Sequence, residues 1–228
     1  MLNAVTHYQV DYPDLALVLA LVRGGTLARA AALLRLTCTD SVLQGLLLPA
    51  LARFMPGYPA LTLELSTSNS FANLSRRDAD IALRLTRTPA EHLVGRCLGT
   101  VSYRVCASPG YAQQQHDIQD LASLAWIAPD DFLPDHPTVA WRRQHLPGVR
   151  PSYRCNSMLS ATELVRAGLG VAALPDFLLG EGHGLQPLGP ALAGHNTALW
   201  LLTRPDCRAL RSVVTLFDEL GQHLRHPS

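Results

Sequence analysis

The pattern of hydrophobic and polar positions is clearest between residues 34 and 65. Leucines alternate with polar residues over 34–39, which is the period of a β-strand. Apolar residues then recur at helical spacing over 41–54, and alternation returns over 61–65 after a break rich in proline and glycine. The sequence therefore predicts a strand–helix–strand unit with a right-handed parallel crossover.

The chain that follows alternates between the same two periods. Strands are predicted at 79–85, 101–107, 151–156, 170–174 and 199–203. Helices are predicted at 71–77, 109–115, 160–167 and 210–224. The segments 129–137 and 187–195 are expected to be loops, and 141–146 has no clear pattern. Alternating elements of this kind favour a mostly parallel α/β sheet, with ligands bound beyond the carboxyl ends of its strands.

Two short helices are predicted ahead of this unit, at 15–23 and 27–34, on either side of a glycine pair. The second helix has a threonine at its cap position and an alanine pair that permits close packing. Such an arrangement is typical of the front half of a helix-turn-helix. The residues that would form it are Gly25, Thr26, Ala30 and Ala31.

Composition describes a globular protein without an obvious charged partner. Of the 228 residues, 48% are hydrophobic and 16% are charged, and the formal net charge is +1. This balance gives no support for nucleic acid or an anionic membrane as a partner. No export signal is recognised, so we expect a cytoplasmic protein. The five cysteines form no C-x-x-C pair, which favours buried thiols, with a redox-sensing cysteine as the alternative.

No catalytic signature occurs in the sequence. A G-x-S-x-G elbow, a P-loop, an H-E-x-x-H helix and a G-x-G-x-x-G turn are all missing, and the nine histidines show no metal-ligand spacing. We therefore predict no catalytic residues, no cofactor and no metal.

Candidate ligand-binding residues lie in the polar turns that follow predicted strands. They are Thr39, Asp40, Ser41, Ser66, Thr67, Ser68, Arg84, Asn156 and Ser157. Arg84 could pair with a ligand carboxylate, although a solvated or ion-paired arginine is the alternative. Asp40 and Ser41 could cap the helix that begins there, where free backbone N–H groups favour an anion. The Asp40 carboxylate opposes an anion unless it points away or binds an amine.

Several stretches resemble the LysR-type transcriptional regulators. DLALVLALVRGGTLARAAALL, residues 14–34, is similar to the opening of that family's DNA-binding domain. LLLPALARFMPGYPALTLEL, residues 46–65, resembles the start of its effector-binding domain, as do residues 79–84 and LVRAGLGVAALP, residues 164–175. The order and spacing of these stretches extend the resemblance over residues 14–226.

The resemblance implies a fold and a set of partners. It implies an α/β, two-lobed effector domain like a type 2 periplasmic binding protein, preceded by a partial helix-turn-helix. Residues 1–33 would be the remnant and 34–228 the effector domain, with lobe one at about 34–100 and 204–228 and lobe two at about 108–198. It implies a small-molecule effector in the interlobe cleft, with a carboxylate as one class, and a homodimer through the effector domain.

One departure from the family changes the expected function. The family's recognition helix, wing and linker helix have no counterpart between residues 34 and 41. The next helix is leucine-rich and carries Pro49 and a single basic residue, Arg53, which does not suit a groove-reading helix. We therefore expect impaired DNA binding, unless another segment reads DNA. A periplasmic-type solute-binding protein and a non-functional truncated regulator are the alternatives.

Overall fold

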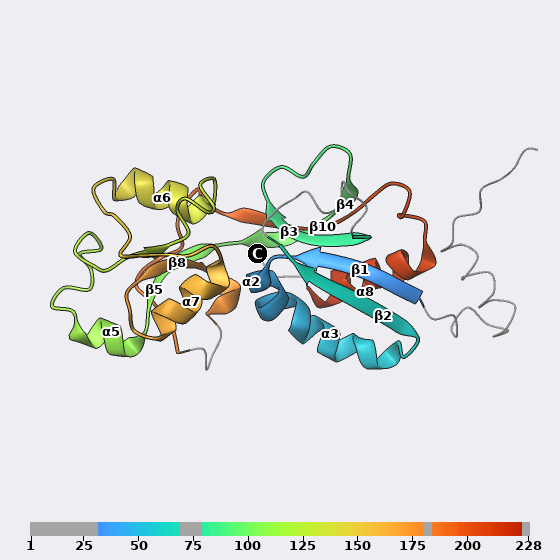
Figure 1. The fold of residues 1–228 in the computed structure, drawn as a ribbon, viewed down its shortest axis with the longest axis horizontal. Helices are drawn as coiled ribbons and strands as arrows, with labels where there is room; N and C mark the ends of the chain where they lie inside the picture. Colours follow the sequence, from blue (N-terminus) through green and yellow to red (C-terminus); the bar gives the residue numbers. More distant parts are fainter. Residues whose placement is uncertain (1–31, 69–78, 180–183, 225–228) are drawn as a thin grey trace, which may run out of the picture.

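Two α/β lobes lie side by side along the long axis of the molecule (Figure 1). The computed structural model describes residues 32–68, 79–179 and 184–224. The helices predicted at 15–23 and 71–77 lie outside the described residues. So do the residues of the predicted helix-turn-helix remnant, Gly25, Thr26, Ala30 and Ala31.

Lobe one is built on a five-stranded sheet with the strand order β2-β1-β3-β10-β4. These strands are β1 (Ala32–Cys38), β2 (Leu61–Thr67), β3 (Ile81–Thr86), β4 (Val94–Val101) and β10 (Thr197–Thr203). β1 runs parallel to β2 and β3, which confirms the predicted parallel strand–helix–strand unit. β10 runs antiparallel to both of its neighbours, β3 and β4.

The strand β1 begins earlier than the sequence indicated. Residues 32–34, predicted as the end of an alanine-rich helix, already pair with β2. Leu34 and Leu36 are buried, whereas Leu33 is exposed, so the segment follows the two-residue period of a strand. Burial against the sheet's core outweighs the helical propensity of alanine and leucine here.

The helix after β1 crosses a proline without breaking. It consists of α2 (Asp40–Val42), the π-helical segment η2 (Leu43–Leu47) and α3 (Leu48–Phe54). Pro49 has no N–H to donate to the carbonyl of Gly45, four residues earlier. The π-helical segment lies directly before this proline-containing turn, and π-helical turns occur mostly as short bulges inside α-helices. The helical run from Asp40 to Phe54 therefore continues through Pro49.

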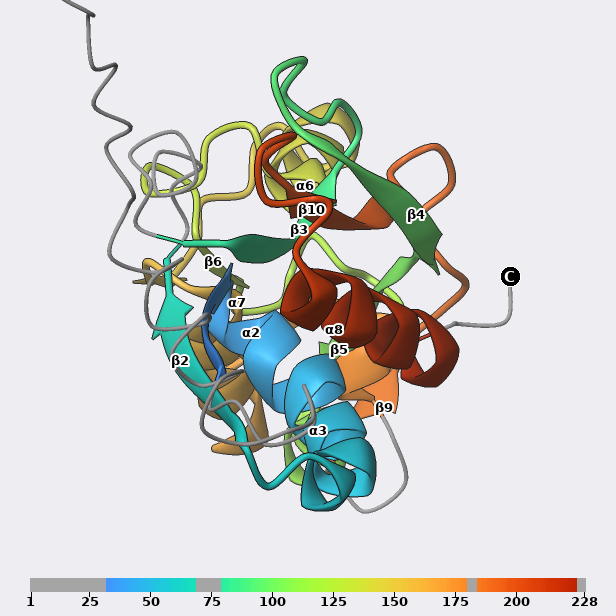
Figure 2. The same ribbon diagram turned by 90° about the vertical axis from the view of Figure 1, so that its right-hand side faces the viewer.

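The last helix, α8 (Arg211–His223), lies beside α3 on the same face of the sheet (Figure 2). Its residues Leu216 and Leu220 are fully buried in the main core. The Tyr58 hydroxyl, just after the short 3₁₀ turn η3 (Met55–Gly57), donates to Glu219 Oε1 over 2.5 Å and joins the two helical segments. The amphipathic pattern predicted over 210–224 is thus confirmed as a core-facing helix.

Lobe two holds two smaller sheets. The three-stranded sheet has the order β8-β5-β9, with β5 (Tyr103–Ala107), β8 (Ala172–Pro175) and β9 (Gln186–Pro187). A second pair joins β6 (Ile127–Ala128) to β7 (Tyr153–Arg154). The helical segments are α5 (Pro109–Gln114), α6 (Pro137–His145), α7 (Met158–Arg166) and η4 (Asp176–Leu178). β5 runs antiparallel to both neighbours, so the prediction of a mostly parallel sheet is wrong.

The chain passes between the lobes twice. Ser102 alone separates β4 in lobe one from β5 in lobe two, and residues 188–196 lead back from β9 to β10. β10 belongs wholly to the five-stranded sheet, so the return precedes Thr197. The returning strand is also what makes the sheet mixed, because it enters between β3 and β4 from the opposite direction. Within the described residues, every helix is too short or too polar to cross a membrane.

Candidate functional site

A cleft of about 530 Å³ opens between the two lobes, beyond the carboxyl ends of β1 and β3. Lobe one contributes Thr39, Ser41 and residues 84–87, and lobe two contributes residues 132–137. Tyr103 and Thr197, which begin the two strands next to the crossings, also line it. A cleft of this size accommodates a small organic molecule.

The polar turn after β1 supplies one wall of the cleft. Thr39 is the N-cap of α2, and its Oγ1 accepts the Val42 N–H at 3.4 Å. The Asp40 carboxylate accepts the Ser41 N–H at 2.7 Å. Asp40 therefore takes up one of the free backbone N–H groups at the start of α2, and it does not line the cleft. The hydroxyls of Thr39 and Ser41 do line it, and they lie 3.3 Å apart.

Arg84 presents a buried cation at the same end of the cleft. Its side chain is held by the Thr37 hydroxyl, which accepts from Nη2 at 3.0 Å, and by the Ser68 carbonyl oxygen, which accepts from Nη1. Only 3% of the residue is exposed, so the solvated arginine considered from the sequence is excluded. Burial lowers the pKa of Arg84 below its usual range. The guanidinium is thus fixed in position before any ligand arrives.

Lobe two places an aromatic and imidazole pair across the cleft. The Tyr103 hydroxyl donates to Thr197 Oγ1 at 3.3 Å, and burial raises the pKa of Tyr103. The His136 ring packs edge to face on the Tyr103 ring, with centroids 5.5 Å apart. Burial lowers the pKa of His136 to about 4, so its imidazole is neutral at pH 7. Phe132 also lines the cleft, with 60% of its surface exposed.

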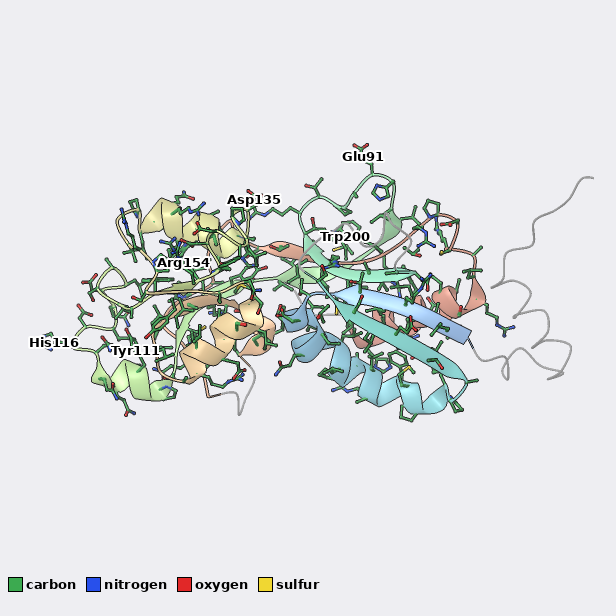
Figure 3. All side chains as sticks on the ribbon, in the orientation of Figure 1. Glu91, Tyr111, His116, Asp135, Arg154 and Trp200 are labelled. Atoms are coloured by element: carbon green, nitrogen blue, oxygen red, sulfur yellow. The ribbon has the colours of Figure 1, made fainter. Side chains whose placement is uncertain are left out.

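Two further charged groups lie at the junction of the lobes. Asp135 lines the cleft from lobe two, and Figure 3 shows it where the two lobes meet. Arg87 lines the cleft from lobe one and hydrogen-bonds to the segment 188–196 that leads back to β10. Its Nη2 donates to the Gly194 carbonyl at 2.8 Å and its Nε to the Asn196 carbonyl at 3.1 Å. Together with Arg84, these groups give the lining one more positive than negative charge.

The structure brings together only some of the residues predicted from the sequence. Thr39, Ser41 and Arg84 share the cleft. Six others do not line it: Asp40, Ser66, Thr67, Ser68, Asn156 and Ser157. β2 is the outer strand of its sheet, so the turn after it lies farther from the crossings, and its Ser68 carbonyl accepts from Arg84. Ser157 instead caps α7, accepting the Ser160 N–H at 3.0 Å.

Several lining residues were missed by the sequence analysis. Phe132 and His136 fall in a segment predicted to be a plain loop, and His195 falls in another. Tyr103 was placed in a strand but not in the site. The available signal was Pro137, since proline favours the first turn of a helix and so marks His136 as its cap. Among the described residues, no group of three or more histidine, cysteine or acidic side chains could hold a metal ion.

Comparison with known proteins agrees with this architecture. The family model described as the LysR substrate binding domain matches residues 28–225. The chain is 30% identical over 174 residues to the Mau operon transcriptional activator of Paracoccus denitrificans, covering 76% of this chain and 59% of that protein. It is 30% identical over 152 residues to the HTH-type transcriptional regulator CrgA of Neisseria meningitidis, covering 65% and 51%. The chain thus spans little more than half the length of these curated relatives.

Solved structures show the same two-lobed α/β fold that the sequence predicted. The regulatory domain of CrgA from Neisseria meningitidis superposes with a TM-score of 0.72 at 25% identity, over 85% of this chain and 98% of that one. The effector domain of AmpR from Pseudomonas aeruginosa shares the fold, with a TM-score of 0.68 at 21% identity, over 85% and 96%. The chain belongs to the LysR-type transcriptional regulators, and residues 28–225 match the substrate-binding domain of that family.

Proposed function

We propose that the interlobe cleft binds a small organic acid as its effector. The observation that carries this is the buried, pre-oriented guanidinium of Arg84 beside the hydroxyls of Thr39 and Ser41. A fixed cation with neighbouring hydroxyl donors recognises a carboxylate without reorganisation on binding. Arg84 and Arg87 bring two positive charges to the lining, and Asp135 brings one negative charge. The single excess positive charge favours an anion with one charge.

The remaining walls favour an apolar body for the same molecule. Leu85 of β3, Phe132 of the loop before α6 and Met158 of α7 lie around the cleft. Burying apolar surface there contributes roughly 25 cal/mol per Å². An acid with a hydrocarbon or aromatic body therefore fits this cleft better than a polyhydroxylated or doubly charged one.

A thermal-shift titration of the full chain against a panel of monocarboxylates tests this proposal. A ligand at a hundredfold excess over its Kd stabilises the fold by about 2.7 kcal/mol, which raises Tm by about 5–10 °C for a chain of this size. Ser41→Ala should weaken a hit by about two- to tenfold, the range for one hydrogen bond. Ser152→Ala, an exposed serine outside the cleft, is the matched control and should change nothing.

We also propose that this chain does not bind DNA sequence-specifically by itself. The strand β1 begins at Ala32, directly after the alanine pair at 30 and 31, which leaves no residues for a recognition helix before the effector domain. The helix that follows β1 buries Leu47, Leu51 and Phe54 in the core rather than presenting a polar face. A groove-reading helix needs side chains that reach base edges and phosphates.

A mobility-shift titration at physiological salt tests the DNA proposal. The probe is the gene's own upstream region, and an unrelated duplex of equal length is the control. The expected result is equal, weak retardation of both duplexes. Submicromolar binding that prefers the upstream region would show that another segment reads DNA. Self-association through the effector domain stays a prediction, and light scattering on the full chain measures it.

A further inference from the structure

We propose that His136 is a ligand-contacting residue whose neutral Nε2–H donates to an uncharged acceptor, such as a carbonyl or ether oxygen, at the lobe-two end of the effector. This assignment rests on the proposed function, because it gives a second polar feature to the molecule bound in the same cleft. The effector class it specifies is a monocarboxylate with an apolar body and a separate hydrogen-bond acceptor.

The tautomer follows from the contacts of the other ring nitrogen. His136 is the N-cap of α6, and its Nδ1 lies 3.4 Å from the Thr138 backbone nitrogen and 2.8 Å from Thr138 Oγ1. A backbone N–H can only donate, so Nδ1 is the acceptor, and the threonine hydroxyl donates to it as well. A neutral imidazole has one acceptor and one donor. The ring proton therefore resides on Nε2.

The same contacts keep the ring uncharged. Burial lowers the pKa of His136 to about 4. A helix N-terminus also disfavours a cation, because its unpaired N–H groups carry partial positive charge. Protonation of Nδ1 would in addition remove the acceptor that caps α6. At neutral pH, His136 can therefore donate one hydrogen bond from Nε2 but cannot serve there as an acceptor or a cation.

The ring is also held in place on its apolar side. It packs edge to face on Tyr103, with an interplanar angle of 83°, and the Tyr103 hydroxyl is anchored on Thr197. Edge-to-face contacts of this kind fix ring orientation. Within the described residues, Nε2 has no hydrogen-bond partner, and it is not among the fully buried unpaired atoms. His136 lines the cleft, so a ligand can supply the acceptor for this N–H.

The two polar features face the cleft from different lobes. Arg84, Thr39 and Ser41 come from lobe one, and His136 comes from lobe two. Apolar side chains, Leu85 and Met158 among them, line the cleft with these polar groups. A ligand with an acid at one end and a neutral acceptor at the other would satisfy both, whereas an acid with a purely hydrocarbon tail would leave the His136 N–H without a protein or ligand partner.

A matched pair of probes tests this with the full chain: 4-acetylbenzoate, which carries a carbonyl acceptor, and 4-isopropenylbenzoate, in which a CH₂ group replaces that oxygen. The variant is His136→Asn, because asparagine is a strong helix N-cap and preserves the start of α6. We expect 4-acetylbenzoate to bind the wild-type chain and to lose about tenfold in affinity to the variant, the upper range for one hydrogen bond. 4-Isopropenylbenzoate should bind both chains within about twofold of each other.

Each other outcome overturns a specific statement. Equal affinity of 4-acetylbenzoate for both chains overturns the role of His136 and leaves the acid-binding cleft standing. Failure of both probes to bind the wild-type chain overturns the cleft proposal, and the His136 assignment with it. Should His136→Asn fail to fold, ¹⁵N NMR of the histidines in the wild-type chain decides the tautomer. A protonated Nδ1 in His136 would overturn the assignment, and an unprotonated Nδ1 supports it.

Discussion

The buried ion pair between Asp130 and Arg142 should be a main determinant of the stability of lobe two. Arg142 Nη2 lies 2.6 Å from Asp130 Oδ2, and the two side chains are 5% and 11% exposed. Arg142 Nη1 also donates to the Val149 carbonyl. This pair joins α6 to the loop that carries Phe132 and His136 into the cleft, so it supports the site as well as the fold.

Arg142→Met should lower the free energy of unfolding by about 3–5 kcal/mol, because it leaves the Asp130 carboxylate buried without a cation. Asp130 Oδ1 already has no hydrogen-bond partner among the described residues, so nothing nearby takes over the charge. For a chain of this length the loss corresponds to a decrease in Tm on the order of 10 °C. Adding Asp130→Leu should restore most of the stability, because an apolar pair of similar volume often matches a buried ion pair.

Urea denaturation of the two single variants and the double variant measures the coupling energy directly. The matched control is Arg154→Met, which breaks the neighbouring Arg154–Asp131 pair at 2.5 Å, where the side chains are 60% and 65% exposed. That loss should be below about 1 kcal/mol, because water screens exposed pairs. Equal small losses from Arg142→Met and Arg154→Met would refute the argument that burial decides the energy of the pair.

Three further predictions concern single positions. The folded pKa of His136, about 4, lies below its ordinary 6.5, so the unfolded chain binds the proton first. The free energy of unfolding should therefore fall as pH decreases from about 6.5 to about 4. In denaturation measured across this pH range, His136→Asn should reduce by about one the difference in bound protons between the unfolded and the folded chain. Gly45→Ala places a Cβ 2.5 Å from the Phe177 ring across the lobes, so it should destabilise by about 1–3 kcal/mol despite alanine's better helix propensity, and Phe177→Leu should relieve this. Gly170→Ala, at φ +154° and with a Cβ only 2.2 Å from the Ala125 carbonyl oxygen, should lower Tm clearly, whereas Gly148→Ala, which meets open space, should not.

Much of lobe one could be predicted because its pattern is local. The strand–helix–strand unit carries its own signals: Leu34 and Leu36 alternate with polar residues, and Leu47, Leu51 and Phe54 repeat at helical spacing. Each of these side chains is buried in one continuous core. A hydrophobic period read along the chain therefore matches a face buried in space.

The elements that were missed lack such a period for identifiable reasons. β4 carries Gly95 and Gly99 and lies at the edge of its sheet, so its residues do not alternate cleanly between apolar and polar. α6 buries Thr138 and Arg142 as well as Val139, and the burial of Arg142 depends on its ion pair with Asp130. A polar residue that is buried because of a distant partner cannot be recognised from the helical period alone.

The two halves of the cleft also differ in whether a local sequence pattern or a distant contact places their residues. Thr39 and Ser41 follow β1, and Arg84 lies in the second half of β3, so the rule that ligands bind beyond the carboxyl ends of strands pointed to them. Tyr103 and Thr197 are 94 residues apart, and only the double crossing between the lobes brings their hydroxyls together. Because the Tyr103 ring also supports His136, the lobe-two side of the site depends on how the two crossings are joined. A ligand that contacts both halves therefore binds one relative placement of the lobes, and any alternative placement that separates Tyr103 from Thr197 would bind it less tightly.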